Sequence, residues 1–203
     1  MTKIAVLVSG GGTNLQALID AQQAGKIENG QISLVVSSNP KAYALERAAK
    51  AAIPSEVLRR RDFSDAEEYG KALTALLENA DIGLIVLAGF MTVLPDSFCR
   101  HFENRIINVH PSLIPSFCGK GMYGLRVHEA ALARGVKVTG ATVHFVNEIP
   151  DGGEILLQKA VEIRPDDTPQ TLQRRVMEQA EWQLLPQAAE LVSEQIVKEK
   201  CNA

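Results

Sequence analysis

The chain has 203 residues, 46% of them hydrophobic and 22% charged, which predicts one globular domain over residues 1–203. Its formal net charge is −3 and its only dense basic run is residues 59–61, so the expected partners are small molecules, with no nucleic acid and no membrane. Three widely spaced cysteines fit no metal-ligand pattern, which favours a metal-free cytoplasmic protein. The sequence leaves the oligomeric state open between a monomer and a homodimer.

The first half of the chain alternates buried strands with amphipathic helices. An apolar run at residues 4–8 indicates a strand buried on both faces, and a helix begins near residue 14 and closes at Gly25 or Gly30. The next predicted elements are strands at 32–36, 56–58 and 82–87 and helices at 42–52 and 65–77. Strands separated by helices favour right-handed crossovers, so the predicted fold class is α/β, an open, mostly parallel twisted sheet with helices on both faces.

The second half is less regular. A strand at 105–109 leads into a loop rich in Pro and Gly and then a helix at 127–133. Strands at 138–146 and 154–161 flank a turn-like segment and predict a late hairpin. Residues 168–200 have a helical pattern, a C-terminal helix in which Pro186 predicts a kink or a break.

A glycine-rich loop joins the first strand to the first helix. Its sequence is Ser9-Gly10-Gly11-Gly12-Thr13-Asn14, and backbone amides at a helix N-terminus favour an anion such as phosphate. The dinucleotide fingerprint fails because Leu15 stands where a further glycine is needed, and no Gly-Lys-Ser/Thr follows. The alternative is a tight turn capped by Thr13 or Asn14, although a turn alone does not need three glycines.

Asn108 and His110 lie two residues apart at the end of an apolar strand, followed by Pro111. Alternation places both side chains on one face, and the carboxyl ends of parallel strands are where ligands bind. An amide beside an imidazole suggests a site that stabilises a developing oxyanion, while a structural histidine is the alternative.

Asp151 and His144 have two interpretations each. Asp151 precedes two glycines that let a loop approach a ligand closely, but an Asp-Gly turn has the same pattern. His144 shares a strand face with Thr142 and Val146, so it is either a hydrogen-bonded core histidine or a possible site residue.

The string at residues 108–117, NVHPSLIPSF, resembles the signature of the folate-dependent formyltransferase family. Further segments agree in the same order, at residues 9–17, 87–94, 139–146 and 151–158. The resemblance covers nearly the whole chain. It implies transfer of the formyl group of 10-formyltetrahydrofolate to the amine of 5-phosphoribosylglycinamide in de novo purine (IMP) biosynthesis. The folate would be a co-substrate, with no tightly bound cofactor.

The resemblance also implies catalytic roles. Asn108 and a protonated His110 would stabilise the oxyanion. Asp151 would favour the imidazolium form of His110 and aid proton transfer, because an opposite charge nearby stabilises a charged group. Glu181 is a possible substrate contact, although it lies one residue away from the position of the corresponding glutamate in the family's final helix. The Ile114–Pro115 peptide bond would be cis.

The resemblance implies two binding segments. Gly12, Thr13 and Asn14 would bind the substrate's phosphate. The folate would contact Asn108 and a run of four further residues, Met91, Thr92, Val93 and Leu94. The loop at 147–152 would cover its pterin. The phosphate loop favours a phosphorylated amine over water or tRNA as acceptor.

Three departures limit what is carried over, and two rivals stay open. Thr92 and Ala66 stand where many relatives have arginine, and the loop at 118–124 is longer than in several of them. One rival is a hydrolase similar to formyltetrahydrofolate deformylase. The other is a non-catalytic module that senses a nucleotide with residues 10–12.

Overall fold

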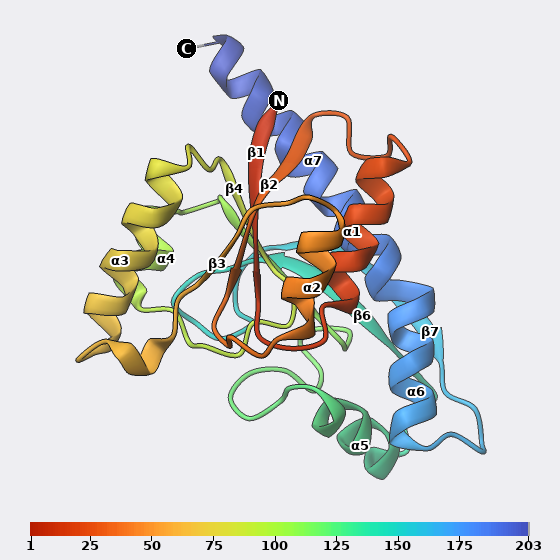
Figure 1. The fold of residues 1–203 in the computed structure, drawn as a ribbon. Coiled ribbons are helices and arrows are strands. Elements are labelled where there is room, and N and C mark those ends of the chain that lie inside the picture. The colour runs from red at the N-terminus through yellow and green to blue at the C-terminus, as the bar shows by residue number, and fades with distance from the viewer. Residues whose placement is uncertain (203) are drawn as a thin grey trace.

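The computed structural model describes residues 1–202, and they form one seven-stranded sheet of order β3-β2-β1-β4-β5-β6-β7 (Figure 1). The strands are β1 (Thr2–Val8), β2 (Gly30–Ser37), β3 (Ser55–Val57), β4 (Leu84–Leu87), β5 (Ile106–His110), β6 (Val138–Phe145) and β7 (Ile155–Glu162). The pairs among β1 to β5 are parallel, whereas β6 pairs antiparallel with both β5 and β7. The predicted α/β fold, with a mostly parallel sheet and a late hairpin, is confirmed.

Helices cover both faces of the sheet (Figure 1). In β1, Val6 and Val8 pack into a core with residues of α1 (Thr13–Gln23), α2 (Tyr43–Lys50), α6 (Pro169–Val176) and α7 (Trp182–Asn202). The alternate residues Ala5 and Leu7 pack against α3 (Ala66–Asn79) and α4 (Asp96–His101). The set is completed by α5 (Leu125–Arg134), a 3-10 turn η1 (Arg60–Asp62) and a π turn η2 (Met177–Glu181). None of the helices described has the length and apolar character needed to cross a bilayer.

The element boundaries differ from the predicted ones by a few residues, with two larger differences. Helix α4 was not predicted, because its six residues are too few to display helical periodicity. Of the kink or break predicted at Pro186, the break is wrong, since α7 passes through this residue. The irregularity lies instead in η2, directly before α7. Pro186 falls in the turn after it, where the backbone ladder is already interrupted and a missing N–H does little harm. At the other end of the chain, α1 closes at Gly25, whose φ is +69°.

The parallel strands bring three loops to one edge of the sheet. β1, β4 and β5 are neighbours, and their carboxyl ends lead into residues 9–12, 88–95 and 111–124. The chain leaves β1 toward β2 on one side, while β4 lies on the other side, so this edge is the topological switch point of the sheet. Ligands of open α/β sheets bind at such a point.

Candidate active site

A cleft of about 400 Å³ opens at this edge. It gathers most of the residues that the sequence pointed to, namely Asn14, Met91, Thr92, Val93, Leu94, Asn108, His110, His144, Asp151 and Glu181. Gly12 and Thr13 do not line it. Thr13 instead lines a larger groove of about 980 Å³ formed mainly by α1 and α7, which contains neither Asn108 nor any histidine. The concentration of titratable and amide side chains makes the smaller cleft the better candidate.

Asn108 and His110 share one face of β5, as strand alternation predicts. Both side chains line the cleft, and His110 is only 5% exposed. Asn108 lies opposite His144 of β6, and His110 lies opposite Thr142. The antiparallel pairing of β5 with β6 therefore delivers His144 to the same place.

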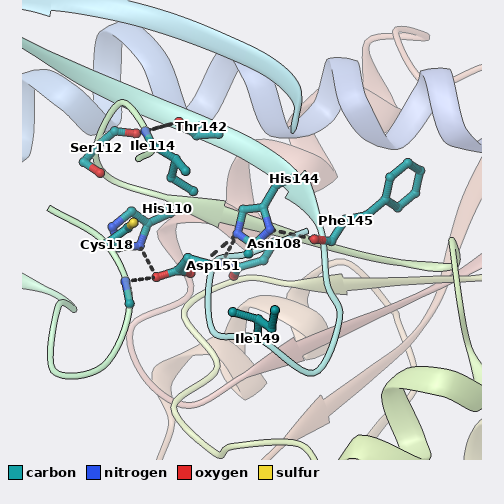
Figure 2. A network of polar contacts seen from close by, with 12 residues as sticks. Asn108, His110, Ser112, Ile114, Cys118, Thr142, His144, Phe145, Ile149 and Asp151 are labelled. Atoms are coloured by element: carbon teal, nitrogen blue, oxygen red, sulfur yellow. Dashed lines mark hydrogen bonds and ion pairs between the residues drawn. The ribbon is translucent and has the colours of Figure 1, made fainter. Parts of the chain in front are cut away.

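Asp151 lies between the two histidines (Figure 2). Its Oδ2 is 3.6 Å from Nδ1 of His110, and its Oδ1 is 3.6 Å from Nε2 of His144. Both distances exceed a hydrogen bond, and each contact is an ion pair only where the imidazole is protonated. The backbone N–H of Gly119 donates to Oδ2 at 2.8 Å, so one carboxylate is shared by three groups.

The two glycines after Asp151 allow close packing within the protein, whereas the sequence predicted that they allow a close approach to a ligand. A Cβ at Gly153 would collide with the carbonyl of Phe145, and one at Gly152 would lie 2.6 Å from Ile149 Cγ2. Asp151 itself has φ of +56°, a left-handed conformation that is uncommon outside glycine. The tight loop thus turns the carboxylate inward, and such strain is found at functional sites.

The environment of Asp151 favours its carboxylate form. Burial opposes ionisation, but the contact with His144, the Gly119 N–H and the charge of His110 outweigh it, so the pKa of Asp151 is lowered. Asp151 is therefore negatively charged at neutral pH, and it faces both imidazoles.

His144 orients Asn108. Its Nδ1 lies 2.7 Å from the carbonyl of Phe145 and its Nε2 lies 3.2 Å from Nδ2 of Asn108 (Figure 2). A carbonyl can only accept, so Nδ1 carries a proton, and in the neutral ring Nε2 accepts from the Asn108 amide. One N–H of Asn108 is used in this way and the other remains free. His144 thus belongs to the site network rather than to the core alone.

The stem of the loop at 118–124 holds His110 and Asp151. Nε2 of His110 donates to the carbonyl of Phe117 at 2.9 Å, and the Asp151 contact with Gly119 comes from the same stem. Because Nε2 is occupied, Nδ1 is the nitrogen of His110 that faces Asp151. The Ile114–Pro115 bond that precedes this stem is cis, which confirms the expectation from the resemblance.

The glycine loop is built differently from a capped turn. Gly12 is the N-cap of α1 with φ of 71°, and among residues 1–202 no side chain caps this helix. A Cβ at Gly12 would lie 2.7 Å from Cβ of Ala44, so a side chain cannot replace the glycine without displacing α2. The first N–H groups of a helix have no partner within it. The reading as a turn capped by Thr13 or Asn14 is therefore wrong, and the uncapped amides are suited to an anion.

The Asn14 side chain points instead to Glu181. Nδ2 of Asn14 donates to Oε2 of Glu181 at 2.8 Å, and burial of this carboxyl raises its pKa to about 7, against the lowering effect of Asn14. Glu181 is the last residue of η2. A π turn accommodates one extra residue in a helix and recurs at functional sites. The one-residue offset of Glu181 from the family pattern thus coincides with the extra residue of this π turn.

This pKa predicts how Glu181→Gln changes stability with pH. The folded-state pKa lies above the model value of 4.5, so deprotonation destabilises the fold as pH rises from about 4.5 through 7. Replacement by Gln removes this penalty. The variant should be more stable than the parent by on the order of 3 kcal/mol at pH 8 and nearly equal to it at pH 4.5. Urea unfolding at both pH values measures the difference. An equal difference at the two pH values would show that Glu181 does not titrate in this range.

Exposed apolar side chains border the cleft at the segment 91–94. Met91 is 54% exposed and Val93 82%, and Ile149 of the facing loop is 65% exposed. The backbone N–H of Met91 donates to Oγ of Ser9 at 2.8 Å, which ties this segment to the glycine loop. A cluster of exposed apolar groups at a cleft indicates a ligand with an apolar body.

The lining residues that sequence reasoning missed include His128, Gln173 and Met177. They come from α5, α6 and η2, and nothing in the sequence separates them from ordinary helical positions. The carbonyl of Phe117 and the N–H of Gly119 were also missed, because backbone groups have no residue signature. Over residues 1–202, no group of three or more His, Cys, Asp or Glu side chains is placed to hold a metal ion.

Comparison with known proteins places this chain in a family. Residues 2–189 match the family model described as formyl transferase. The phosphoribosylglycinamide formyltransferase of Haemophilus influenzae is 44% identical over 186 residues, which cover 92% of this chain and 84% of that protein. The human trifunctional purine biosynthetic protein adenosine-3 is 41% identical over 94% of this chain, which spans 18% of that protein.

Solved structures agree. A crystal structure of glycinamide ribonucleotide transformylase 1 from Symbiobacterium toebii has a TM-score of 0.89 at 38% identity, over 96% of this chain and 89% of that one. The structure from Coxiella burnetii titled phosphoribosylglycinamide formyltransferase in complex with CHES has a TM-score of 0.87 at 38% identity, over 96% and 88% of the two chains. The chain belongs to the formyl transferase family.

Proposed function

We propose that this chain transfers the formyl group of 10-formyltetrahydrofolate to the amine of 5-phosphoribosylglycinamide in de novo purine biosynthesis, with residues 1–203 acting as one domain. The observation that carries the proposal is the convergence of Asn108, His110 and Asp151 in one cleft, which Asn14 and the segment 91–94 also line. The names of the similar proteins support the same reaction.

The acceptor amine binds at the glycine-loop end. The uncapped N-terminus of α1, at Gly12, Thr13 and Asn14, receives the phosphate, because amides and the helix dipole both favour an anion. The neighbouring pair of Asn14 and Glu181 reaches into the cleft and contacts the polar part of the same substrate.

The formyl-folate binds at the other end as a co-substrate. Its pterin and aromatic ring have apolar faces that match the exposed side chains of Met91, Val93 and Ile149, and Thr92 and Leu94 complete this wall. Burial of such faces on binding is favourable by about 25 cal/mol per Å². The tie between Met91 and Ser9 fixes the spacing of the two ends.

The reaction forms one bond and breaks another at the formyl carbon. The amine nitrogen attacks this carbon and the C=O electrons move to oxygen. When the carbonyl re-forms, the bond between the formyl carbon and the folate nitrogen breaks, and this nitrogen keeps the electron pair and takes up the proton that the amine has lost. The free N–H of Asn108 and the Nδ1–H of His110 donate to the oxyanion, a type of contact worth about 10²–10³ in rate. Asp151 contacts Nδ1 of His110 and accepts the proton lost by the amine, directly or through water.

Two incubations of the protein with 10-formyltetrahydrofolate test the proposal, one with and one without 5-phosphoribosylglycinamide. The expected result is formylated product and free tetrahydrofolate only when the amine is present. A deformylase-like hydrolase would release formate at the same rate in both tubes. A nucleotide-sensing module would release nothing in either. Either of these results would overturn the proposal.

A further inference from the structure

His128 is a buried imidazole without partners. It lies in α5, its exposure is 0%, and within residues 1–202 neither Nδ1 nor Nε2 has a hydrogen-bond partner. Leaving a buried donor or acceptor unpaired is unfavourable, and native proteins rarely do so without a functional reason. The ring also lines the candidate active-site cleft. Both nitrogens have almost no exposed surface, so pairing with a group in the cleft requires a small shift of this wall.

The chemistry of His128 is that of a neutral ring. Burial lowers its pKa to about 4, and the charge of nearby His110 acts in the same direction. A neutral imidazole presents one N–H donor and one acceptor nitrogen. It is suited to an uncharged polar group and poorly suited to phosphate, because an anion is bound best by a cation or by several donors.

The position of His128 selects one end of the cleft. Helix α5 packs beside α6 (Figure 1), and the cleft wall continues through Gln173, Met177 and Glu181 to Asn14. Oδ1 of Asn14 is also buried without a partner. Two side chains with unpaired polar atoms thus occur in the part of the wall assigned to the acceptor amine.

We propose that His128 is a substrate-binding residue that hydrogen-bonds an uncharged polar group of the acceptor, either its amide or a ribose hydroxyl. This inference rests on the proposed function, which supplies the acceptor. It explains why a destabilising arrangement is retained, since binding satisfies nitrogens that are unpaired in the empty cleft. A residue used in this way trades stability for affinity.

His128→Phe is the principal test, because the ring size is kept and both nitrogens are removed. The dissociation constant for 5-phosphoribosylglycinamide, measured by calorimetry without folate, should rise about three- to tenfold. The KM for formyl-folate should not change. The melting temperature of the unliganded protein should rise by about 2–4 °C, because unpaired polar atoms are lost from the interior. His128→Gln keeps a donor and an acceptor and should bind the acceptor more tightly than His128→Phe.

Thr139→Val is a matched control. Oγ1 of Thr139 is also buried and unpaired, but this residue does not line the cleft. Its replacement should raise the melting temperature and leave acceptor binding unchanged. Equal affinity of the wild type and His128→Phe would overturn the inference. If His128→Phe does not fold, equal affinity of His128→Gln and His128→Leu would do the same. A wild-type protein that binds no 5-phosphoribosylglycinamide would instead contradict the proposed function.

Discussion

Replacing Asp151 by Asn should lower kcat by about a thousandfold, within the 10²–10⁴ range of general acid–base effects, and change KM little. The substitution keeps the shape of the side chain and an oxygen that can accept from Gly119 N–H. It removes the negative charge that lies 3.6 Å from both His110 and His144. The amine proton then has no carboxylate to accept it. Steady-state kinetics of formyl transfer measures the effect.

Asp81→Asn is the matched control for Asp151→Asn. Asp81 has the same left-handed backbone, with φ of 56°, and it also forms an ion pair, with Lys3 at 3.4 Å. It precedes β4 and so lies at the opposite edge of the sheet from the cleft. This control should keep full activity. Turnover of Asp151→Asn within a factor of about three of the wild type would remove Asp151 from the mechanism, because general acid–base groups contribute far more.

Most of the fold was predictable because local patterns and the global fold agree. Continuous apolar runs identified the central strands, and the alternation with helices predicted the parallel sheet. The hydrophobic pattern failed at α4, which is too short to show helical periodicity. It also failed in the C-terminal helical segment, where both a proline and a π turn disturb the helix. Pro186 is the stronger breaker on sequence grounds, yet the π turn at Met177–Glu181 takes up the distortion before the chain reaches it.

The candidate site was predictable to the extent that it lies on a strand. Alternation along β5 predicted that Asn108 and His110 lie on one face, and this prediction did not depend on the family resemblance. Asp151 and His144 had open interpretations, because their proximity depends on the pairing of β5 with β6 and on a left-handed residue in the following loop. His128 had no signal at all. Its distinction is that its nitrogens lack partners, and this property exists only once the chain is folded.

Replacing Asn108 by Leu should lower kcat by about 10²–10³, the usual loss for one oxyanion donor. Leucine has nearly the shape of asparagine but no N–H for the oxyanion. KM for the acceptor amine should change little, because its benefit from the Asn108 contact arises only in the transition state. Asn108→Ser retains a donor at shorter reach and should recover part of the rate. Equal kcat for the wild type and Asn108→Leu would show that this amide does not contact the reacting oxygen.

The role of His144 follows from combining Asn108→Leu with His144→Phe. Nε2 of His144 lies 3.2 Å from the Asn108 amide and 3.6 Å from Asp151. If His144 acts by orienting Asn108, its removal should be costly in the wild type and nearly without effect once Asn108 is leucine. The coupling energy should then be about 1–3 kcal/mol, as for residues in one hydrogen-bond network. If His144 acts mainly through Asp151, the two losses in kcat should multiply, because the contact with Asp151 does not depend on Asn108.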